Sequence, residues 1–155
     1  MSVKIGDRAP EFCLPDSDEQ EICMKNLQGK WIVLYFYPKD NTSGCTLEAI
    51  DFTKQMNSFK SLNCDIIGVS PDSPKSHCNF RDKHEIGIQL LSDPSHKVIK
   101  AFGCWVKKKM YGREYYGVER STFLIDPFGI VQHEWRKVKV KEHVETVEDK
   151  LKQLQ

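Results

Sequence analysis

One unbroken apolar segment, residues 31–37 (Trp-Ile-Val-Leu-Tyr-Phe-Tyr), constrains the possible folds of this chain more than any other feature. A run of this kind is typical of a strand covered on both faces of a sheet, and residues 66–69 form a second one. Between the two runs, residues 45–62 carry apolar side chains at helical spacing: Ala49, Phe52, Met56 and Phe59. This strand–helix–strand order predicts a mixed α/β fold with the two runs as central strands.

The rest of the chain extends this pattern. Further strands are predicted at residues 21–23, 89–91, 122–125 and 130–135, and the second apolar run extends to a strand over residues 65–70. Helices are predicted at residues 73–84, after residues 93–95, and over an apolar stripe formed by Val144, Val147, Leu151 and Leu154. The resulting order is β–β–α–β–α–β–α–β–β–α. Since no repeat or linker interrupts it, we expect one domain over residues 1–155.

Composition narrows the function classes. Lys and Arg total 23 against 22 Asp and Glu, so the net charge gives no indication of a nucleic-acid partner. The sequence shows no apolar signal segment and no stretch approaching a membrane span, and we expect a cytoplasmic protein without a membrane partner. Six cysteines are scattered without a Cys-x-x-Cys pair. This spacing argues against a zinc site and predicts that most of them are thiols, and we expect neither a metal nor another cofactor.

The segment after the first apolar run points to sulfur chemistry. Residues 38–48 read Pro-Lys-Asp-Asn-Thr-Ser-Gly-Cys-Thr-Leu-Glu and join the strand to the helix, which places Cys45 in the first helical turn. Unpaired backbone N–H groups and the positive end of the helix dipole favour a thiolate there. Thr42 precedes the sulfur by three residues, and Glu48 follows it by three. The pattern predicts a reactive cysteine rather than a buried structural one.

The pattern Pro-x-x-x-Thr-x-x-Cys, with Glu three residues after the cysteine, resembles the active site of peroxiredoxins. Residues 36–49 are similar to the peroxiredoxin Q branch, also called bacterioferritin comigratory protein. The resemblance covers nearly the whole chain, from Gly6 to the C-terminal helix. It implies a thioredoxin-like fold with a central mixed sheet, flanking helices and an N-terminal β extension.

The resemblance also implies a role for each group of the site. Cys45 is the thiolate that attacks the peroxide O–O bond and becomes a sulfenic acid. Pro38 shields the thiolate from water, and the Thr42 hydroxyl contacts both the sulfur and a peroxide oxygen. Arg120, at the start of a late strand, supplies the cation that stabilises the thiolate. Glu48 accepts hydrogen bonds from the Arg120 guanidinium and fixes its direction.

The sequence departs from the best-known pattern of this branch at the resolving cysteine. Many members carry it five residues after the reactive cysteine, where this chain has Ile50. Others carry it in the helix after the next strand, near Arg81, and Cys78 lies one turn earlier in that helix, about 60° away around its axis. Cys78 also points away from Phe80, which we expect to anchor the helix to the core. Cys78 is therefore the candidate resolving cysteine, and local unwinding would let it form a disulfide with Cys45.

The remaining cysteines are weaker candidates. Cys104 precedes residues 105–116, a segment that reads as an exposed hairpin, and it is the next candidate for the resolving step. Cys64 opens a central strand and is expected to be buried. Cys13 and Cys23 are expected to pack as ordinary apolar residues in the N-terminal extension.

The predicted function is that of a thiol-dependent hydroperoxide reductase acting on hydrogen peroxide and organic hydroperoxides. The resemblance implies recycling by thioredoxin or a similar dithiol, and a monomer. Two alternatives remain open: a one-cysteine peroxidase that uses an external thiol, and a non-catalytic thioredoxin-fold sensor that relays oxidation from Cys45 to a partner. A disulfide oxidoreductase is disfavoured because its chemistry requires a Cys-x-x-Cys pair.

Overall fold

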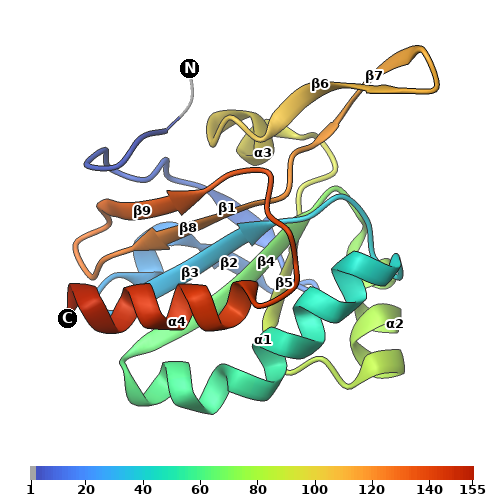
Figure 1. The fold of residues 1–155 in the computed structure, drawn as a ribbon. Helices are drawn as coiled ribbons and strands as arrows, with labels where there is room; N and C mark the ends of the chain where they lie inside the picture. Colours follow the sequence, from blue (N-terminus) through green and yellow to red (C-terminus); the bar gives the residue numbers. More distant parts are fainter. Residues whose placement is uncertain (1–2) are drawn as a thin grey trace.

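A computed structural model describes residues 3–155 of the chain (Figure 1). Within this range a central five-stranded sheet has the order β5-β4-β3-β8-β9, and two hairpins, β1-β2 and β6-β7, lie outside it. The elements are β1 (Cys13–Pro15), β2 (Glu21–Cys23), a 3-10 helix (Met24–Leu27), β3 (Trp31–Phe36), α1 (Ser43–Ser61), β4 (Cys64–Ser70), α2 (Pro74–His84), β5 (Gln89–Ser92), α3 (Lys97–Ala101), β6 (Trp105–Met110), β7 (Arg113–Val118), β8 (Ser121–Ile125), β9 (Val131–Trp135) and α4 (His143–Leu154).

The first apolar run of the sequence forms β3, the middle strand of the sheet. It pairs in parallel with β4 and antiparallel with β8, so both of its edges are hydrogen-bonded. From Ile32 to Phe36 its residues are at most 1% exposed, which explains why the run contains no polar residue. Parallel strands need a crossover, and α1 provides it between β3 and β4. The start of α1 therefore lies at the C-terminal end of the central strand.

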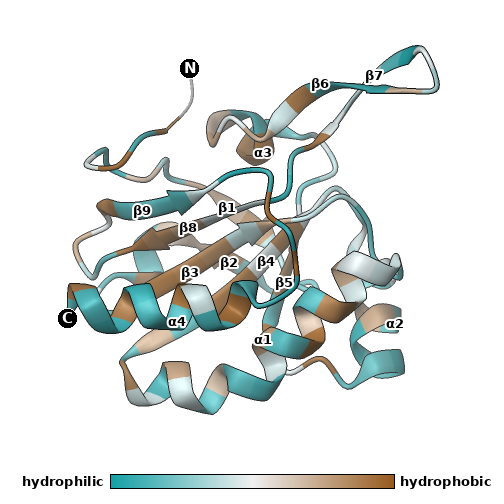
Figure 2. Cartoon of the chain, in the orientation of Figure 1, coloured by the Kyte–Doolittle hydropathy of each residue, from teal (hydrophilic) through white to brown (hydrophobic). Residues whose placement is uncertain are grey.

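Two apolar layers cover the two faces of the sheet. On one face α1, α2 and α4 contribute Phe52, Phe80 and Val147, which pack in one cluster with Tyr35 of β3. On the other face α3 and the β1-β2 hairpin contribute side chains to a second cluster, among them Ile99 and Leu14. Figure 1 shows α1 and α4 in front of the sheet, and Figure 2 shows hydrophobic residues concentrated on the central strands.

At each edge of the sheet, a short segment from outside the sheet pairs with the chain. Beside β5, Asp16 forms an antiparallel bridge with Leu91, and beside β9, Arg8 does so with Ile130. Both bridges satisfy backbone groups that an edge strand would otherwise leave open to other chains. The first bridge also brings the β1-β2 hairpin next to α2, which precedes β5.

Most of the predicted elements are confirmed, and the differences have simple causes. The segment predicted as an exposed hairpin forms β6 and β7 and extends to Val118. Strand β1 is missing from the predicted order because its three residues carry no periodic signal and form a strand only through pairing with β2. Of the helices within residues 3–155, none is long and apolar enough to cross a membrane.

Candidate active site

Cys45 lies in the first turn of α1, as the sequence predicts. Thr42 is the N-cap residue with an extended backbone (φ −79°, ψ 153°), and its carbonyl accepts the hydrogen bond from the N–H of Thr46 at 2.9 Å. The Cys45 side chain is a free thiol and is 1% exposed. The sulfur is therefore buried beside the positive end of the helix dipole.

Arg120 brings its charge directly to this sulfur. Its Nη2 donates to Cys45 Sγ at 3.2 Å, and its Nη1 donates to Glu48 Oε1 at 2.6 Å. Because Cys45 and Glu48 stand one helical turn apart, one planar guanidinium can reach both. Burial opposes the charged form, but Glu48 and Cys45 outweigh it and raise the pKa of Arg120. The contact predicted between these three residues is thus present.

Glu48 is the most deeply buried charged group of the site. It is fully buried, and burial raises its pKa to about 7, even though the Arg120 guanidinium acts in the opposite direction. Its second oxygen, Oε2, has no hydrogen-bond partner among residues 3–155. The Glu48 carboxyl therefore changes its charge near neutral pH. The same carboxyl accepts the hydrogen bond that orients Arg120, so the strength of this contact also changes there.

Pro38 and Thr42 both lie in the loop between β3 and α1. Pro38 is half-buried, and Thr42 is exposed at the helix start. The Thr42 hydroxyl donates to the carbonyl of Lys39 at 2.9 Å, so its hydrogen is engaged with the loop backbone. The lone pairs of the hydroxyl remain available to accept a hydrogen bond from a peroxide. The predicted contact of Thr42 with the sulfur and the peroxide stays a prediction.

Gly44 has a role that the motif alone did not reveal. A Cβ atom at this position would lie 3.3 Å from Nη2 of Arg120, the nitrogen that contacts Cys45. The absence of a side chain therefore leaves room for the guanidinium beside the sulfur. The sequence signal is a glycine directly before the reactive cysteine, but only the position of Arg120 explains it.

Two more titratable groups lie within electrostatic reach of Arg120. Lys108 of β6 is half-buried, and burial and Arg120 lower its pKa while Glu119 and Cys45 act to raise it. Its neighbours Lys107 and Lys109 are exposed. His143 accepts or donates a hydrogen bond at 2.8 Å between its Nε2 and Thr122 Oγ1. Burial, with Arg120, lowers the pKa of His143 to about 4, so this imidazole is neutral at physiological pH.

A buried polar network connects the Cys45 loop to α2. Asp40, in the loop, accepts hydrogen bonds from the Tyr37 hydroxyl at 2.7 Å and the Ser76 hydroxyl at 2.8 Å. His77 of α2 lies 2.7 Å from Asp40 Oδ2 through Nδ1, and 2.9 Å from the carbonyl of Leu91 through Nε2. Sequence reasoning missed this residue, although its spacing of three from the core residue Phe80 is a signal for burial.

The position of Cys78 agrees with the orientation expected for it. Cys78 is a partly exposed free thiol on α2, while Phe80 is fully buried. Nη2 of Arg81 lies 3.4 Å from Cys78 Sγ. Cys45 and Cys78 are both unbonded thiols here, as expected for a pair that meets only after local unwinding.

Two other cysteines lack the access that a resolving thiol needs. Cys104 is fully buried rather than exposed beside the hairpin, and burial raises its pKa to about 11. It also belongs to the apolar cluster on the sheet face opposite Cys45. Cys64 is buried as predicted, and burial raises its pKa to about 12. These placements disfavour Cys104 as the next candidate for the resolving step.

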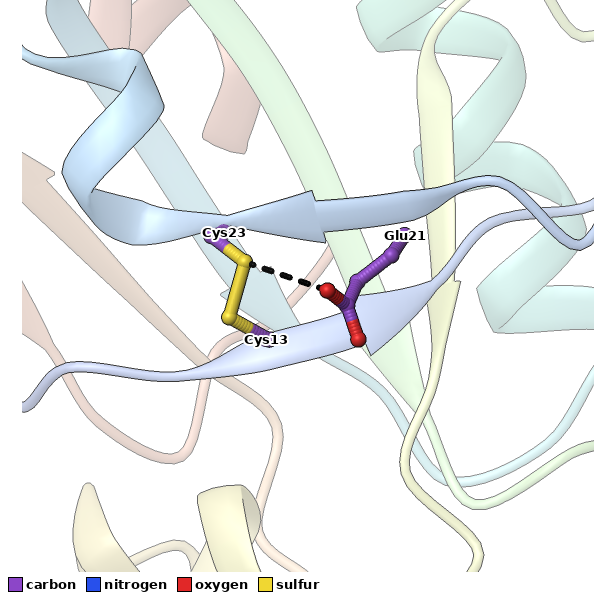
Figure 3. Close-up of a disulfide and its surroundings, with 3 residues drawn as sticks. All are labelled: Cys13, Glu21 and Cys23. Carbon is purple, nitrogen blue, oxygen red and sulfur yellow. Dashed lines mark hydrogen bonds between the residues drawn. A yellow bond between two sulfur atoms is a disulfide. The ribbon is translucent and has the colours of Figure 1, made fainter.

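The expectation for Cys13 and Cys23 is wrong. The two residues face each other in the antiparallel register of β1 and β2, with a Cα–Cα distance of 4.0 Å, and their sulfurs form a disulfide (Figure 3). The sequence favours ordinary apolar packing for them, because they lie in the N-terminal extension and no Cys-x-x-Cys pair is present. Only the pairing of the two short strands brings the sulfurs together.

Two groups of side chains within residues 3–155 have atoms close enough to share a metal ion. One consists of Cys13, Glu21 and Cys23, and the other of Asp40, Asp72 and His77. In the first group the two sulfurs are bonded to each other. In the second the oxygens and the ring nitrogens already take part in hydrogen bonds. Neither arrangement calls for a metal to satisfy its polar atoms.

Comparison with known proteins places this chain in a family. Residues 5–134 match the AhpC/TSA family. The chain is 51% identical over 144 residues to peroxiredoxin Bcp of Bacillus subtilis, covering 93% of this chain and 92% of the relative. The chain belongs to the AhpC/TSA family of peroxiredoxins. It is also 37% identical to peroxiredoxin Bcp of Escherichia coli over 97% of both chains.

Solved peroxiredoxin structures agree with the fold. Peroxiredoxin Q of Xanthomonas campestris superimposes with a TM-score of 0.88 at 42% identity, covering 92% of this chain and 90% of that one. A cysteine-to-serine variant of PrxQ from Xylella fastidiosa gives a TM-score of 0.94 at 38% identity, covering 99% and 98%. The predicted peroxiredoxin-type, thioredoxin-like fold, with its central mixed sheet and flanking helices, is confirmed. Another similar structure is that of the X. campestris bacterioferritin comigratory protein, whose description concerns the alkyl peroxide reduction activity of that protein.

Proposed function

We propose that the protein reduces hydrogen peroxide and organic hydroperoxides through Cys45. The thiolate attacks the terminal oxygen of the peroxide and the O–O bond breaks. The leaving oxygen takes up a proton and departs as water or an alcohol, and Cys45 becomes a sulfenic acid. Arg120 stabilises the thiolate and orients the peroxide, Thr42 accepts a hydrogen bond from it, and Pro38 limits access of water.

The observation that carries this proposal is the guanidinium of Arg120 bridging Cys45 and Glu48. A charge held in place by a buried carboxylate acts on the sulfur without reorganising during the reaction. A structural cysteine at a helix start has no need for a cation fixed in this way. The bridge therefore favours a peroxidase over a passive redox sensor.

We further propose that Cys78 completes the cycle. Its thiol attacks the sulfenic sulfur of Cys45 and releases water, which leaves a Cys45–Cys78 disulfide. A dithiol reductant such as thioredoxin then reduces this disulfide and is itself oxidised. The partial exposure of Cys78 and the burial of Cys64 and Cys104 support this assignment. A monomer fits this cycle, because both cysteines belong to one chain. A location in the cytoplasm is part of the same proposal, because dithiol reductants such as thioredoxin act there.

The test follows single turnovers in a stopped-flow instrument by tryptophan fluorescence, with mass spectrometry of quenched samples. We expect rapid oxidation of Cys45 by both hydrogen peroxide and an organic hydroperoxide, then a disulfide between Cys45 and Cys78. Cys104→Ser is the matched control for Cys78→Ser, and it should leave disulfide formation intact. Oxidation of Cys45 no faster than that of a free thiol would refute the peroxidase assignment. A sulfenic acid that persists until an external thiol is added would instead support the one-cysteine cycle.

A further inference from the structure

A second sulfur site lies apart from the proposed catalytic cycle. The Cys13–Cys23 disulfide joins the two strands of the N-terminal hairpin (Figure 3). The hairpin packs through Leu14 into the apolar cluster on one face of the sheet, whereas Cys45 belongs to the cluster on the other face. This disulfide therefore cannot act on Cys45 by direct contact, and any influence on the cycle must pass through the elements that the hairpin touches.

The turn of the hairpin is held by one carboxylate. Oδ1 of Asp16 accepts hydrogen bonds from the N–H groups of Asp18 and Gln20, both at 2.9 Å. Oδ2 of the same residue accepts from Nε2 of Gln89 on β5 at 2.9 Å. The turn is thus ordered within itself and tied to the edge of the sheet beside α2.

From this position the turn holds the second half of α2. Nη1 of Arg81 donates to Ser17 Oγ at 2.8 Å and to both carboxylate oxygens of Asp18 at 3.1 Å. Nη2 of the same guanidinium lies 3.4 Å from Cys78 Sγ. One arginine therefore connects the hairpin turn to the helical turn that carries Cys78. That helical turn has to unwind if Cys78 is to reach Cys45.

We propose that the Cys13–Cys23 couple is a redox-controlled clasp on α2 that sets the rate at which Cys78 reaches Cys45. The inference rests on the proposed role of Cys78 as the resolving cysteine. While the disulfide is intact, the cross-link keeps the short hairpin paired and its turn ordered, so Arg81 stays bound. Strands of three residues pair only marginally without such a link. Reduction therefore loosens the turn, releases Arg81 and lets α2 unwind more often.

The chemistry of the switch is an ordinary thiol–disulfide exchange. Cys13 is exposed and Cys23 is 6% exposed, so a thiolate of a dithiol reductant reaches Cys13 Sγ and forms a mixed disulfide with it. Cys23 leaves as a thiolate and takes up a proton. The second thiol of the reductant then displaces Cys13, so two electrons and two protons convert the disulfide into two thiols.

Glu21 slows this reduction. Its Oε1 lies 3.7 Å from Cys23 Sγ (Figure 3). In the disulfide this sulfur has no hydrogen to donate, and when Cys23 leaves as a thiolate the carboxylate repels it. Only the protonated Cys23 thiol can donate a hydrogen bond to Glu21. The clasp therefore opens slowly when a reductant attacks it, and as long as it stays closed the Cys45 sulfenic acid persists longer.

The test compares Cys45–Cys78 disulfide formation in the wild-type protein and in the double variant Cys13→Ser/Cys23→Ser. In rapid-quench mass spectrometry we expect the double variant to close the disulfide about three- to ten-fold faster, the size expected for losing a few surface contacts. The rate of Cys45 oxidation by peroxide should stay the same, which also reports an intact fold.

A second pair of variants keeps the disulfide and changes only the turn. Asp18→Asn weakens the hold on Arg81 and should accelerate closure by a similar factor. Glu19→Gln removes the same charge from the same turn without touching that contact, and it should have no effect. Adding Cys13→Ser/Cys23→Ser to Asp18→Asn should give less than the product of the two accelerations, because both act through one contact.

Each result of these experiments either supports the clasp or overturns it. Acceleration that is shared between the disulfide variant and Asp18→Asn supports the clasp. Equal closure rates in wild type and the double variant overturn it while the proposed function stands. Absence of any Cys45–Cys78 disulfide overturns both the role of Cys78 and the clasp. Non-reducing peptide mapping that finds Cys13 and Cys23 as thiols in air-oxidised protein would overturn the clasp alone.

Discussion

Replacing Glu48 with glutamine tests whether the buried carboxyl carries its charge at a cost to stability. One oxygen of Glu48 is bound by Arg120 at 2.6 Å, and the other has no partner among the described residues. Burial raises the pKa of this carboxyl from 4.5 to about 7, against the effect of Arg120. Glu48→Gln keeps the shape of the side chain but cannot ionise. It therefore removes the pH-dependent loss of folding stability that ionisation of the buried carboxyl causes.

The sign of the effect follows from proton binding. Below pH 4.5 Glu48 is protonated in both the folded and the unfolded chain, and its contribution to stability is fully present. Between pH 4.5 and about 7 the unfolded chain releases this proton while the folded protein keeps it, so stability falls as the pH rises. At about 1.4 kcal/mol per pH unit, the total loss by pH 8 is about 3 kcal/mol.

His143 has the opposite effect over an overlapping range. Burial lowers the pKa of this imidazole from 6.5 to about 4. The folded protein therefore binds fewer protons than the unfolded chain between these values, and stability is lost as the pH falls from 6.5 toward 4. Because the two effects nearly cancel, the wild-type stability should change little through these two groups, whereas Glu48→Gln should expose the His143 effect.

The assay is urea unfolding of reduced wild-type and Glu48→Gln protein at pH values from 4 to 8. We expect the free energy of unfolding of the variant, minus that of the wild type, to increase by about 3 kcal/mol over this range. Glu114→Gln, which removes an exposed carboxylate paired with Lys107 at 2.6 Å, is the control and should change stability by less than about 1 kcal/mol. A difference between Glu48→Gln and wild type that stays constant from pH 4 to 8 would show that burial does not govern this carboxyl.

Four further variants test the site and the N-terminal disulfide. Cys45→Ser should abolish peroxidase turnover and leave the fold intact by circular dichroism; residual turnover would remove the central assignment. Arg120→Lys keeps the charge but cannot bridge two partners, and the stopped-flow rate of Cys45 oxidation should fall by about tenfold or more, so a wild-type rate would contradict its role. Cys78→Ser should consume one equivalent of peroxide and then stall with thioredoxin as the reductant; undiminished turnover would exclude Cys78. Cys13→Ser/Cys23→Ser should lower the free energy of unfolding by up to about 2.5 kcal/mol, given a sequence separation of 10, and an unchanged urea midpoint would show that the cross-link does not restrict the unfolded chain.

Local patterns were sufficient for most of the elements and for the position of Cys45 in a first helical turn. The apolar run at β3 and the helical spacing of α1 are each encoded within a few residues, because both patterns depend on neighbours along the chain. The same holds for α2, where the Ser73 hydroxyl accepts a hydrogen bond from the N–H of Ser76 at 3.1 Å and Pro74 opens the helix. The position of Arg120 at the site was predicted only through the family resemblance.

The tertiary structure decided the contacts between residues that lie far apart in the sequence. Arg120 reaches Cys45 across 75 positions, a contact that exists because β8 pairs with β3 in one particular register. The Cys13–Cys23 disulfide depends on the pairing of β2 with β1, a strand too short to be recognised from its own residues. The sequence by itself determined that Cys45 stands at the start of a helix and that an apolar central strand precedes this helix. Only the folded chain decided which charges and which second sulfur pair surround it, because register and sheet order are set by packing over the whole core.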